Sequence, residues 1–311
     1  MESGSFAIFT QMAILFVVIG AGYICKKCHL TTHEVDRGLS AVTLNVAMPA
    51  LILSSVLTAE QLPSAVEIAI TFFAGLAVHV FLLALAFGIT TLLRVPADHK
   101  GAYRFMLVFG NVGFLGFPVI AAIFGADALI YASIFNLPFN LLAYTAGPWL
   151  ITQDKADAEP EKVTIKTFTN PMMIVCLVAI LLVILGVKNI PVITDIFTLA
   201  GNMATPAAMI VIGSQLADIP VHEVLGTPKI WIVSIFRLII CPLLVWLVFS
   251  PFIENSVILG SIVIISAMPV ANVGVMFSLF YGVETKTLSQ GIFISTVLSL
   301  ITIPLLVMIM L

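Results

Sequence analysis

Two asparagines in this chain lie beside residues that break helices, in two apolar stretches far apart in the sequence. Asn111 lies in the nine residues from Gly110 to Pro118, which include three glycines, and Asn272 lies between Pro269 and Gly274. Such residues interrupt a helix and free backbone groups that need partners in an apolar environment. Asparagine donates and accepts hydrogen bonds without carrying a charge. Because helix N-termini attract anions and C-termini attract cations, two facing breaks predict a site for a small solute.

A structural explanation stays open, because glycine and proline also let membrane helices pack closely. Two breaks at related positions, each with an asparagine, favour a functional crossover over packing alone.

A second polar motif occurs twice, half a chain apart. Residues 45–50, Asn-Val-Ala-Met-Pro-Ala, return 157 residues later at 202–207 as Asn-Met-Ala-Thr-Pro-Ala, in a chain of 311 residues. The same shift pairs Phe124-Gly125 with Tyr281-Gly282. These matches predict two related halves, each with a proline-interrupted helix, which is typical of secondary transporters.

The segments that carry these motifs must lie in lipid. Hydrophobic residues make up 61% of the chain and Asp, Glu, Lys and Arg only 9%, too few charges to cover a soluble domain of this length. Only helices satisfy their own backbone in such segments, so we expect an all-α integral membrane protein. Ten segments are long enough to span or nearly span a bilayer. They lie at about 6–24, 38–58, 64–93, 102–124, 126–150, 170–187, 190–217, 229–250, 256–281 and 288–310.

The basic residues predict the orientation of these spans. With the N-terminus outside, the cytoplasmic loops hold eleven of the 13 lysines and arginines, as the positive-inside rule requires, so both termini are expected outside. A polar loop at 151–169 separates five spans in residues 1–150 from five in residues 170–311. Because five is odd, the second half starts on the opposite side of the membrane. The halves therefore form an inverted repeat, with a binding site expected near the midplane.

The motifs of spans four and nine resemble those of the auxin efflux carrier family. They are Asn-x-x-x-x-Gly-x-Pro from Asn111 to Pro118, and Met268-Pro269 with Asn272 and the later Tyr281-Gly282. The Asn-x-x-x-Pro-Ala pair of spans two and seven fits as well. The resemblance covers essentially the whole chain, and the short central loop is similar to that of the prokaryotic members. Plant members transport auxin, and bacterial members include carriers assigned to malonate and malate.

The resemblance implies the inverted-repeat fold of bile-acid and auxin transporters. Spans 1, 2, 6 and 7 would form a scaffold that also makes a homodimer contact, and spans 3–5 and 8–10 would form a transport domain that moves like an elevator. The substrate would lie where the broken spans four and nine cross, with Asn111 as the substrate-contacting asparagine, Pro118 as the crossover proline and Asn202 as a scaffold contact. Plant carriers have a second crossover proline where this chain has Val275, which favours a polar or ion-assisted site over one for indole auxin.

The residues predicted to form the site fall into two groups. The predicted substrate-binding residues are Asn111, Gly113, Pro118, Asn202, Asn272 and Asn45. The candidates for the crossover or for ion coupling are Pro269, Gly274, Asn136, Asn140, His79 and Arg237.

Several of these candidates have two interpretations. Arg237 either is a counter-charge for a carboxylate substrate or snorkels to the cytoplasmic interface about two turns away. His79 either carries a proton for coupled transport or is a neutral structural histidine. Asn136 and Asn140 either face the crossover or bond to neighbouring helices.

These features predict a secondary transporter in the cell membrane. Its substrates would be small organic anions, either mono- or dicarboxylates such as malonate and malate or auxin-like acids. No phosphate-binding loop of the type Gly-x-x-x-x-Gly-Lys-Ser/Thr occurs, so a sodium or proton gradient, or simple uniport, would drive it. No cofactor, metal or nucleic-acid partner is expected. Cys25, Cys28, His29 and His33 resemble a metal cluster in their spacing but fit free thiols at a helix end better. A channel or receptor is the alternative, and an intramembrane enzyme is disfavoured because no Asp or Glu lies deep in a span.

Overall fold

The computed structural model describes residues 2–153, 171–218 and 226–310, with side chains from Thr10 onward. Within these ranges every regular element is helical, and the one extended pairing is an isolated bridge between Gly110 and Val270. Seven helical runs are long and apolar enough to cross a membrane, and three shorter apolar helices accompany them. The prediction of an all-α membrane protein is therefore confirmed. The predicted cytoplasmic loop at 151–169 lies outside the described residues beyond Gln153.

Contacts divide the chain into two compact units, and each unit takes elements from both halves of the sequence. Unit 1 comprises Met1–Thr71, Val112–Asn136 and Thr169–Pro220. Unit 2 comprises Phe72–Asn111, Leu137–Phe168 and Val221–Leu311. Helices α4 (Ala65–Leu92) and α7 (Ala128–Thr152) contribute to both.

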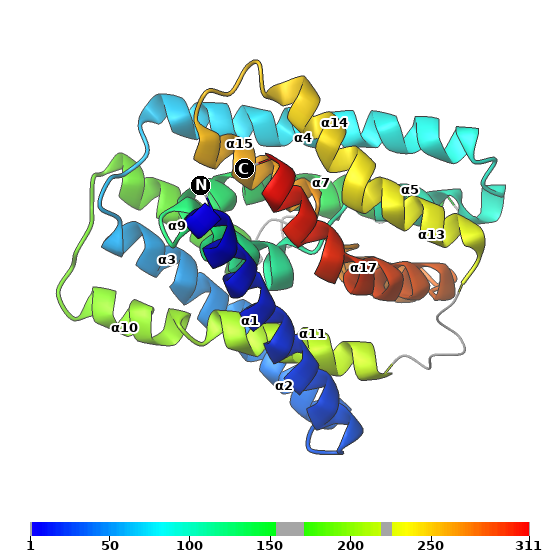
Figure 1. Cartoon of the computed structure of the whole chain (residues 1–311), viewed down its shortest axis with the longest axis horizontal. Coiled ribbons are helices and arrows are strands. Elements are labelled where there is room, and N and C mark those ends of the chain that lie inside the picture. The colour runs from blue at the N-terminus through cyan, green and yellow to red at the C-terminus, as the bar shows by residue number, and fades with distance from the viewer. Residues whose placement is uncertain (1, 154–170, 219–225, 311) are drawn as a thin grey trace. The chain divides into compact units, whose positions relative to one another are not determined.

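The other elements can be followed by their colours in Figure 1. Those of unit 1 are α1 (Glu2–Lys27), α2 (His33–Val42), η1 (Thr43–Ala47), α3 (Met48–Thr58), η3 (Val112–Gly116), α6 (Phe117–Phe124), α9 (Pro171–Ile184), α10 (Ile193–Gly201) and α11 (Ala204–Asp218). Those of unit 2 are η2 (Ala97–His99), α5 (Lys100–Val108), α13 (Pro228–Ile235), η4 (Phe236–Ile240), α14 (Cys241–Phe249), α15 (Ser256–Ser266), α16 (Val273–Phe280) and α17 (Lys286–Met310).

Helices α1 and α11 cross in close contact within unit 1, where α1 is blue and α11 yellow-green (Figure 1). Two glycines make this contact. A Cβ atom on Gly22 would lie 2.3 Å from the carbonyl oxygen of Ile210, and one on Gly213 would lie 1.9 Å from that of Ile19. Backbones that approach this closely leave no room for a side chain. The two glycines therefore fix the pairing of helices that are far apart in the sequence.

The repeated Asn-x-x-x-Pro-Ala motif interrupts its helix in both copies, in two different ways. In the first copy the π-helical segment η1 ends two residues before Pro49. Such a widened turn relieves the clash between a proline ring and the carbonyl group four residues earlier. In the second copy the helix stops, since α10 ends at Gly201 and α11 begins at Ala204. Both asparagines, Asn45 and Asn202, are exposed.

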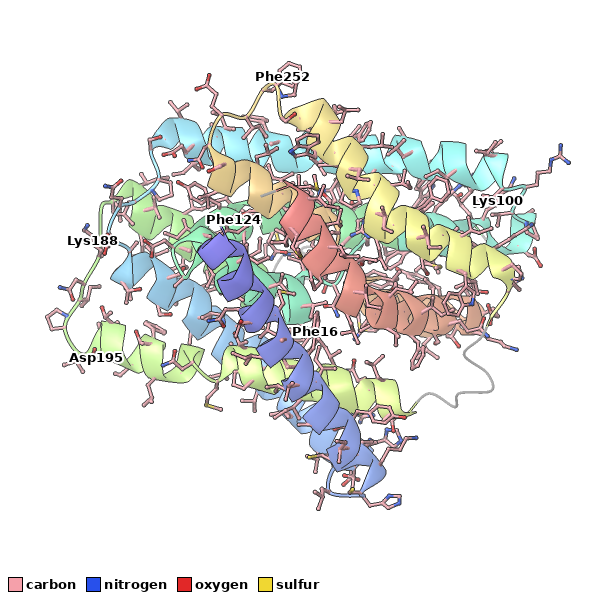
Figure 2. The ribbon with its side chains drawn as sticks, viewed as in Figure 1. Phe16, Lys100, Phe124, Lys188, Asp195 and Phe252 are labelled. Carbon is pink, nitrogen blue, oxygen red and sulfur yellow. The ribbon has the colours of Figure 1, made fainter. Side chains whose placement is uncertain are left out.

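The connection between α9 and α10 is tied back to the segment that follows α3. Helix α9 ends where Val187 N–H donates to the carbonyl group of Leu182 at 2.9 Å, with Gly186 at a φ of +67°. This is the common glycine-dependent way of ending a helix. Lys188 follows and donates to the carbonyl group of Glu60 at 2.8 Å, and Asp195 lies in the first turn of α10 (Figure 2). These contacts fix the connection at one end of unit 1.

The core of unit 2 contains a row of aromatic rings in edge-on and tilted contact. Helix α17 contacts α5, α13 and η4, and α14 contacts α15. Neighbouring ring centroids lie 5.0–6.4 Å apart in a continuous row. The row runs through His79, Phe139, Phe109, Phe105, Phe277 and Tyr144. Edge-on and tilted contacts of this kind stabilise a core beyond the area they bury, so the row supports the segment around Phe109 from one side.

Candidate functional site

Within unit 2, the structure pairs the beginning of the first predicted helix break with the second predicted break. Helix α5 ends at Val108, and α15 ends at Ser266. In the extended segments that follow, the amide of Asn111 donates to the carbonyl oxygen of Pro269 at 2.7 Å, and the amide of Ala271 donates to that of Phe109 at 3.0 Å. This short antiparallel pairing is centred on Gly110 and Val270. The backbone groups that the breaks release therefore satisfy one another, as an apolar environment requires.

A buried arginine completes the pairing on the side of the helix C-termini. Arg237, in η4, is 1% exposed. Its Nε donates to the carbonyl oxygen of Met268 at 3.0 Å, and its Nη1 donates to those of Leu107 and Val108 at 2.9 and 3.1 Å. The last carbonyl groups of a helix lack intrahelical partners and carry partial negative charge. The guanidinium of Arg237 therefore donates hydrogen bonds to backbone carbonyl groups at the C-terminal ends of both half-helices.

The contacts of Arg237 correct one of its two sequence interpretations. A snorkelling side chain extends its charged head into water. The guanidinium of Arg237 is instead buried and bonded to backbone carbonyl groups. Gly110 leaves the space for it, because a Cβ atom on Gly110 would lie 2.2 Å from Nη2 of Arg237.

The asparagines lie where the second half-helices begin. Asn111 precedes Val112, the first residue of η3, and Asn272 is the N-cap residue of α16. Asn111 is buried and Asn272 half-buried. Positive partial charge gathers at helix N-termini. Each broken helix thus presents a C-terminal end to Arg237 and an amide side chain at the start of its second half.

A shared tripeptide marks these two positions in the sequence. Asn-Val-Gly occurs at 111–113 and again at 272–274, a shift of 161 residues from Asn111 to Asn272. The Asn-x-x-x-Pro-Ala motifs of predicted spans two and seven are 157 residues apart. The spacing of Asn111 and Asn272 therefore differs from that of the motifs by about one helical turn. Comparison of tripeptides would have found this register. Pro269 lies three residues before Asn272 and Gly274 lies two residues after it. A Cβ atom on Gly274 would lie 2.4 Å from the ring of Phe105.

Three predicted site residues, Asn45, Gly113 and Pro118, belong to unit 1. Asn45, on η1, donates from Nδ2 to the carbonyl group of Ala41 at 2.8 Å. Gly113, on η3, would meet Leu44 of η1 at 3.7 Å if it carried a Cβ atom. The two π-helical segments are thus neighbours. Pro118 is buried as the second residue of α6.

Three further candidates are buried side chains. His79 Nδ1 lies 2.6 Å from the carbonyl oxygen of Gly75 on its own helix. Asn136, in unit 1, donates from Nδ2 to Sγ of Cys176 at 3.8 Å, which is a bond to the neighbouring helix α9. Asn140 is buried in unit 2. The two asparagines of α7 therefore belong to different units although they lie one turn apart.

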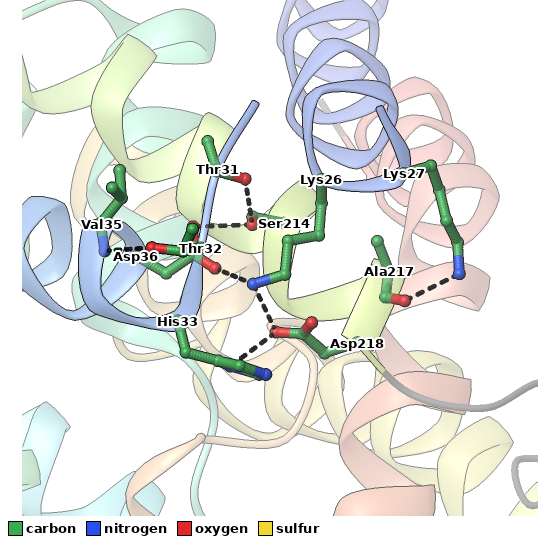
Figure 3. A network of polar contacts seen from close by, with 10 residues as sticks. All are labelled: Lys26, Lys27, Thr31, Thr32, His33, Val35, Asp36, Ser214, Ala217 and Asp218. Atoms are coloured by element: carbon green, nitrogen blue, oxygen red, sulfur yellow. Dashed lines mark hydrogen bonds and ion pairs between the residues drawn. The ribbon is translucent and has the colours of Figure 1, made fainter. Parts of the chain in front are cut away.

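A second polar cluster lies in unit 1, where α1 and α11 end and α2 begins (Figure 3). Lys26 stands at its centre, since its Nζ forms an ion pair with Asp36 and another with Asp218 at 3.1 Å. Asp36 is buried and also accepts a hydrogen bond from Ser214 Oγ at 2.7 Å. His33 Nδ1 lies 3.4 Å from Oδ2 of Asp218. The cluster therefore connects three helix ends.

The same cluster contains a set of atoms with metal-like spacing. Ligand atoms of His33, Asp36 and Asp218 all lie within 4.8 Å of one another. The ammonium group of Lys26 pairs with both carboxylates, however, and supplies the positive charge that a metal ion would bring. Cys25 and Cys28 are free thiols outside this set. The geometry therefore fits an ion-pair network better than a metal site.

Asp36→Asn is expected to lower the melting temperature of the purified protein. The substitution leaves Lys26 with Asp218 alone and weakens the contact with Ser214, at a cost of about 1–3 kcal/mol. Thermal unfolding in detergent measures the effect. His33→Asn is the matched control, because the His33 side chain is 83% exposed and exposed ion pairs contribute at most about 1 kcal/mol. Equal changes in the two variants would contradict the central role of Asp36.

Comparison with known proteins shows the family of the chain. The chain matches the family described as membrane transport protein over residues 7–307. An uncharacterized transporter of Methanocaldococcus jannaschii is 27% identical over 309 residues, which cover 94% of this chain and 95% of that protein. One from Methanothermobacter thermautotrophicus is 25% identical over 308 residues, covering 95% and 96%. The uncharacterized transporter YfdV of Escherichia coli K12 is 24% identical over 300 residues, covering 94% of each chain.

These relatives match this chain nearly from end to end. The chain belongs to the membrane transport protein family, which is the auxin efflux carrier family that the motifs of spans four and nine indicated.

Proposed function

We propose that this membrane transporter moves small organic anions, mono- or dicarboxylates, across a cell membrane by alternating access. The observation that carries the proposal is the crossover of unit 2, where Arg237 joins two helix C-termini and Asn111 and Asn272 begin the second half-helices. Uncharged amides and helix N-termini suit a carboxylate. A site at broken helices is the arrangement that secondary transporters use.

The charge of the crossover supports an anion rather than a cation. Within the described residues the ion pairs involve Lys26, His33 and His99, and none gives Arg237 an acidic partner. A guanidinium keeps its charge at any physiological pH. In a surrounding of low dielectric constant its field reaches several ångströms. An anionic solute bound nearby would therefore be stabilised, and a cation would be repelled.

The division into two units supports the elevator mechanism as part of the proposal. Unit 1 gathers the predicted spans 1, 2, 6 and 7, the expected scaffold and dimer contact. Unit 2 gathers spans 8, 9 and 10 and most of spans 3 and 5. Two parts of the expected transport domain group with unit 1 instead, namely residues 64–71 of span 3 and residues 112–136. We propose that the boundary of the moving part falls next to Asn111, with ten spans and both termini outside.

Binding to the purified protein tests this function. A ligand that binds only the folded state raises the melting temperature according to its concentration and affinity. We expect malonate, malate or a small monocarboxylate to raise it, while matched neutral amides do not. If no carboxylate does so and a neutral or cationic solute does, the assignment of organic anions is wrong.

Asn111→Ala is expected to abolish this stabilisation and the transport that depends on it. Loss of one amide that bonds a charged ligand costs about 1.5–3 kcal/mol, or roughly 10- to 150-fold in affinity. The melting temperature without ligand should change by only a few degrees, because the backbone amide of residue 111 still donates to Pro269. Unchanged ligand affinity in the variant would show that Asn111 does not contact the substrate.

A further inference from the structure

Three carbonyl groups at the crossover form a cluster of the kind that binds cations. Those of Leu107 and Val108 come from the end of α5, and that of Met268 follows the end of α15. All three accept hydrogen bonds from one guanidinium at 2.9–3.1 Å. Oxygen ligands and the negative ends of two helices would suit a hard cation such as sodium. In this chain the cluster already holds a cation that is part of the protein.

We propose that Arg237 is the built-in cation of this crossover, and that anion binding and transport therefore require no sodium or other metal cation. This inference rests on the proposed function, because it concerns the ion that accompanies the transported anion. The sequence leaves sodium coupling, proton coupling and uniport open, and we now expect that sodium is not coupled to transport. The positive charge moves with the binding site instead of being taken up with each substrate.

The packing around Arg237 leaves no position for a metal ion in the same cluster. Its side chain is 1% exposed. Its Nη2 fills the space that a side chain on residue 110 would occupy, since a Cβ atom there would lie 2.2 Å away. A metal cation would have to displace the guanidinium from all three carbonyl groups or lie beside a like charge. Both are unfavourable where the dielectric constant is low. The described spans offer no ion pair that would offset the added charge.

A sodium titration of the purified protein, without any carboxylate, tests the inference directly. Melting temperatures are compared in sodium, potassium and choline chloride at equal ionic strength. We expect the same value in all three salts. A rise that is specific to sodium and saturates with its concentration would overturn the inference, whatever the substrate proves to be. Failure of the proposed function is distinguishable, because it would show as the absence of carboxylate binding in every salt.

Two variants of Arg237 sharpen the test. Arg237→Gln vacates the carbonyl cluster, so its melting temperature should become dependent on sodium, and its affinity for malonate should fall about 10- to 100-fold. Arg237→Lys keeps a positive charge and should stay independent of sodium. A glutamine variant that folds, ignores sodium and binds malonate as the natural protein does would overturn the inference. If the glutamine variant does not fold, the sodium titration of the natural protein still decides the matter.

Discussion

Alanine in place of Gly22 or Gly213 is expected to force α1 and α11 apart and to lower the stability of the protein strongly. The added Cβ would lie 2.3 Å from a backbone oxygen in the first case and 1.9 Å in the second. A backbone atom cannot turn aside as the end of a flexible side chain can. Overpacking of this kind costs about 1–3 kcal/mol and sometimes more, and the measurement is the melting temperature in detergent.

The matched control lies two residues away from Gly22 on the same helix. Gly20 has no atom within 4 Å of the position that its Cβ would take. Gly20→Ala should leave the melting temperature unchanged or raise it slightly, because alanine favours a helix by about 1 kcal/mol over glycine. If Gly22→Ala and Gly20→Ala had the same melting temperature, the close crossing of α1 and α11 in unit 1 would be contradicted.

Alanine in place of Gly110 is expected to abolish carboxylate binding and transport. Its Cβ would lie 2.2 Å from Nη2 of Arg237 and 3.1 Å from both Cβ and the carbonyl oxygen of Met268. The guanidinium can move, but only by giving up the carbonyl groups at the ends of α5 and α15. Each buried carbonyl group left without a donor costs about 1–3 kcal/mol. We therefore expect a lower melting temperature together with loss of the malonate-induced shift.

Gly88→Ala is the control for this variant in the same unit. Gly88 lies on α4 with no atom within 4 Å of its added Cβ, so binding should persist and stability should hold. If Gly110→Ala bound malonate with natural affinity and melted at the natural temperature, Arg237 would not be holding the crossover together.

The sequence predicted the breaks of this crossover because their causes are local. Proline removes a backbone donor and glycine weakens a helix wherever they stand, so the segments around Asn111 and Asn272 were identifiable without a structure. Composition and the lengths of the apolar segments likewise predicted an all-helical membrane protein. The exact pairing of Gly110 with Val270 was not predictable in the same way, since the repeated motif of spans two and seven gives a shift that differs by about one turn.

The role of Arg237 could not be predicted, because its partners are backbone atoms of two distant segments. Carbonyl groups carry no sequence signature, and a lone arginine in an apolar helix fits a counter-charge or a snorkelling side chain equally well. The polar cluster of Lys26 was missed for a related reason. One of its two acidic partners, Asp218, comes from α11, far along the chain. The local spacing of Cys25 and Cys28 resembles that of a metal cluster and gives no sign of these ion pairs.

Exchange of malonate across vesicles that contain the purified protein tests the central claim most directly. Vesicles preloaded with unlabelled malonate should take up labelled malonate from outside, with a rate that saturates and is the same in sodium and choline salts. Vesicles with equal amounts of folded Asn111→Ala protein should show background uptake only. Equal uptake by the two proteins would contradict the assignment of the crossover as the anion site, and uptake that never saturates would indicate a channel.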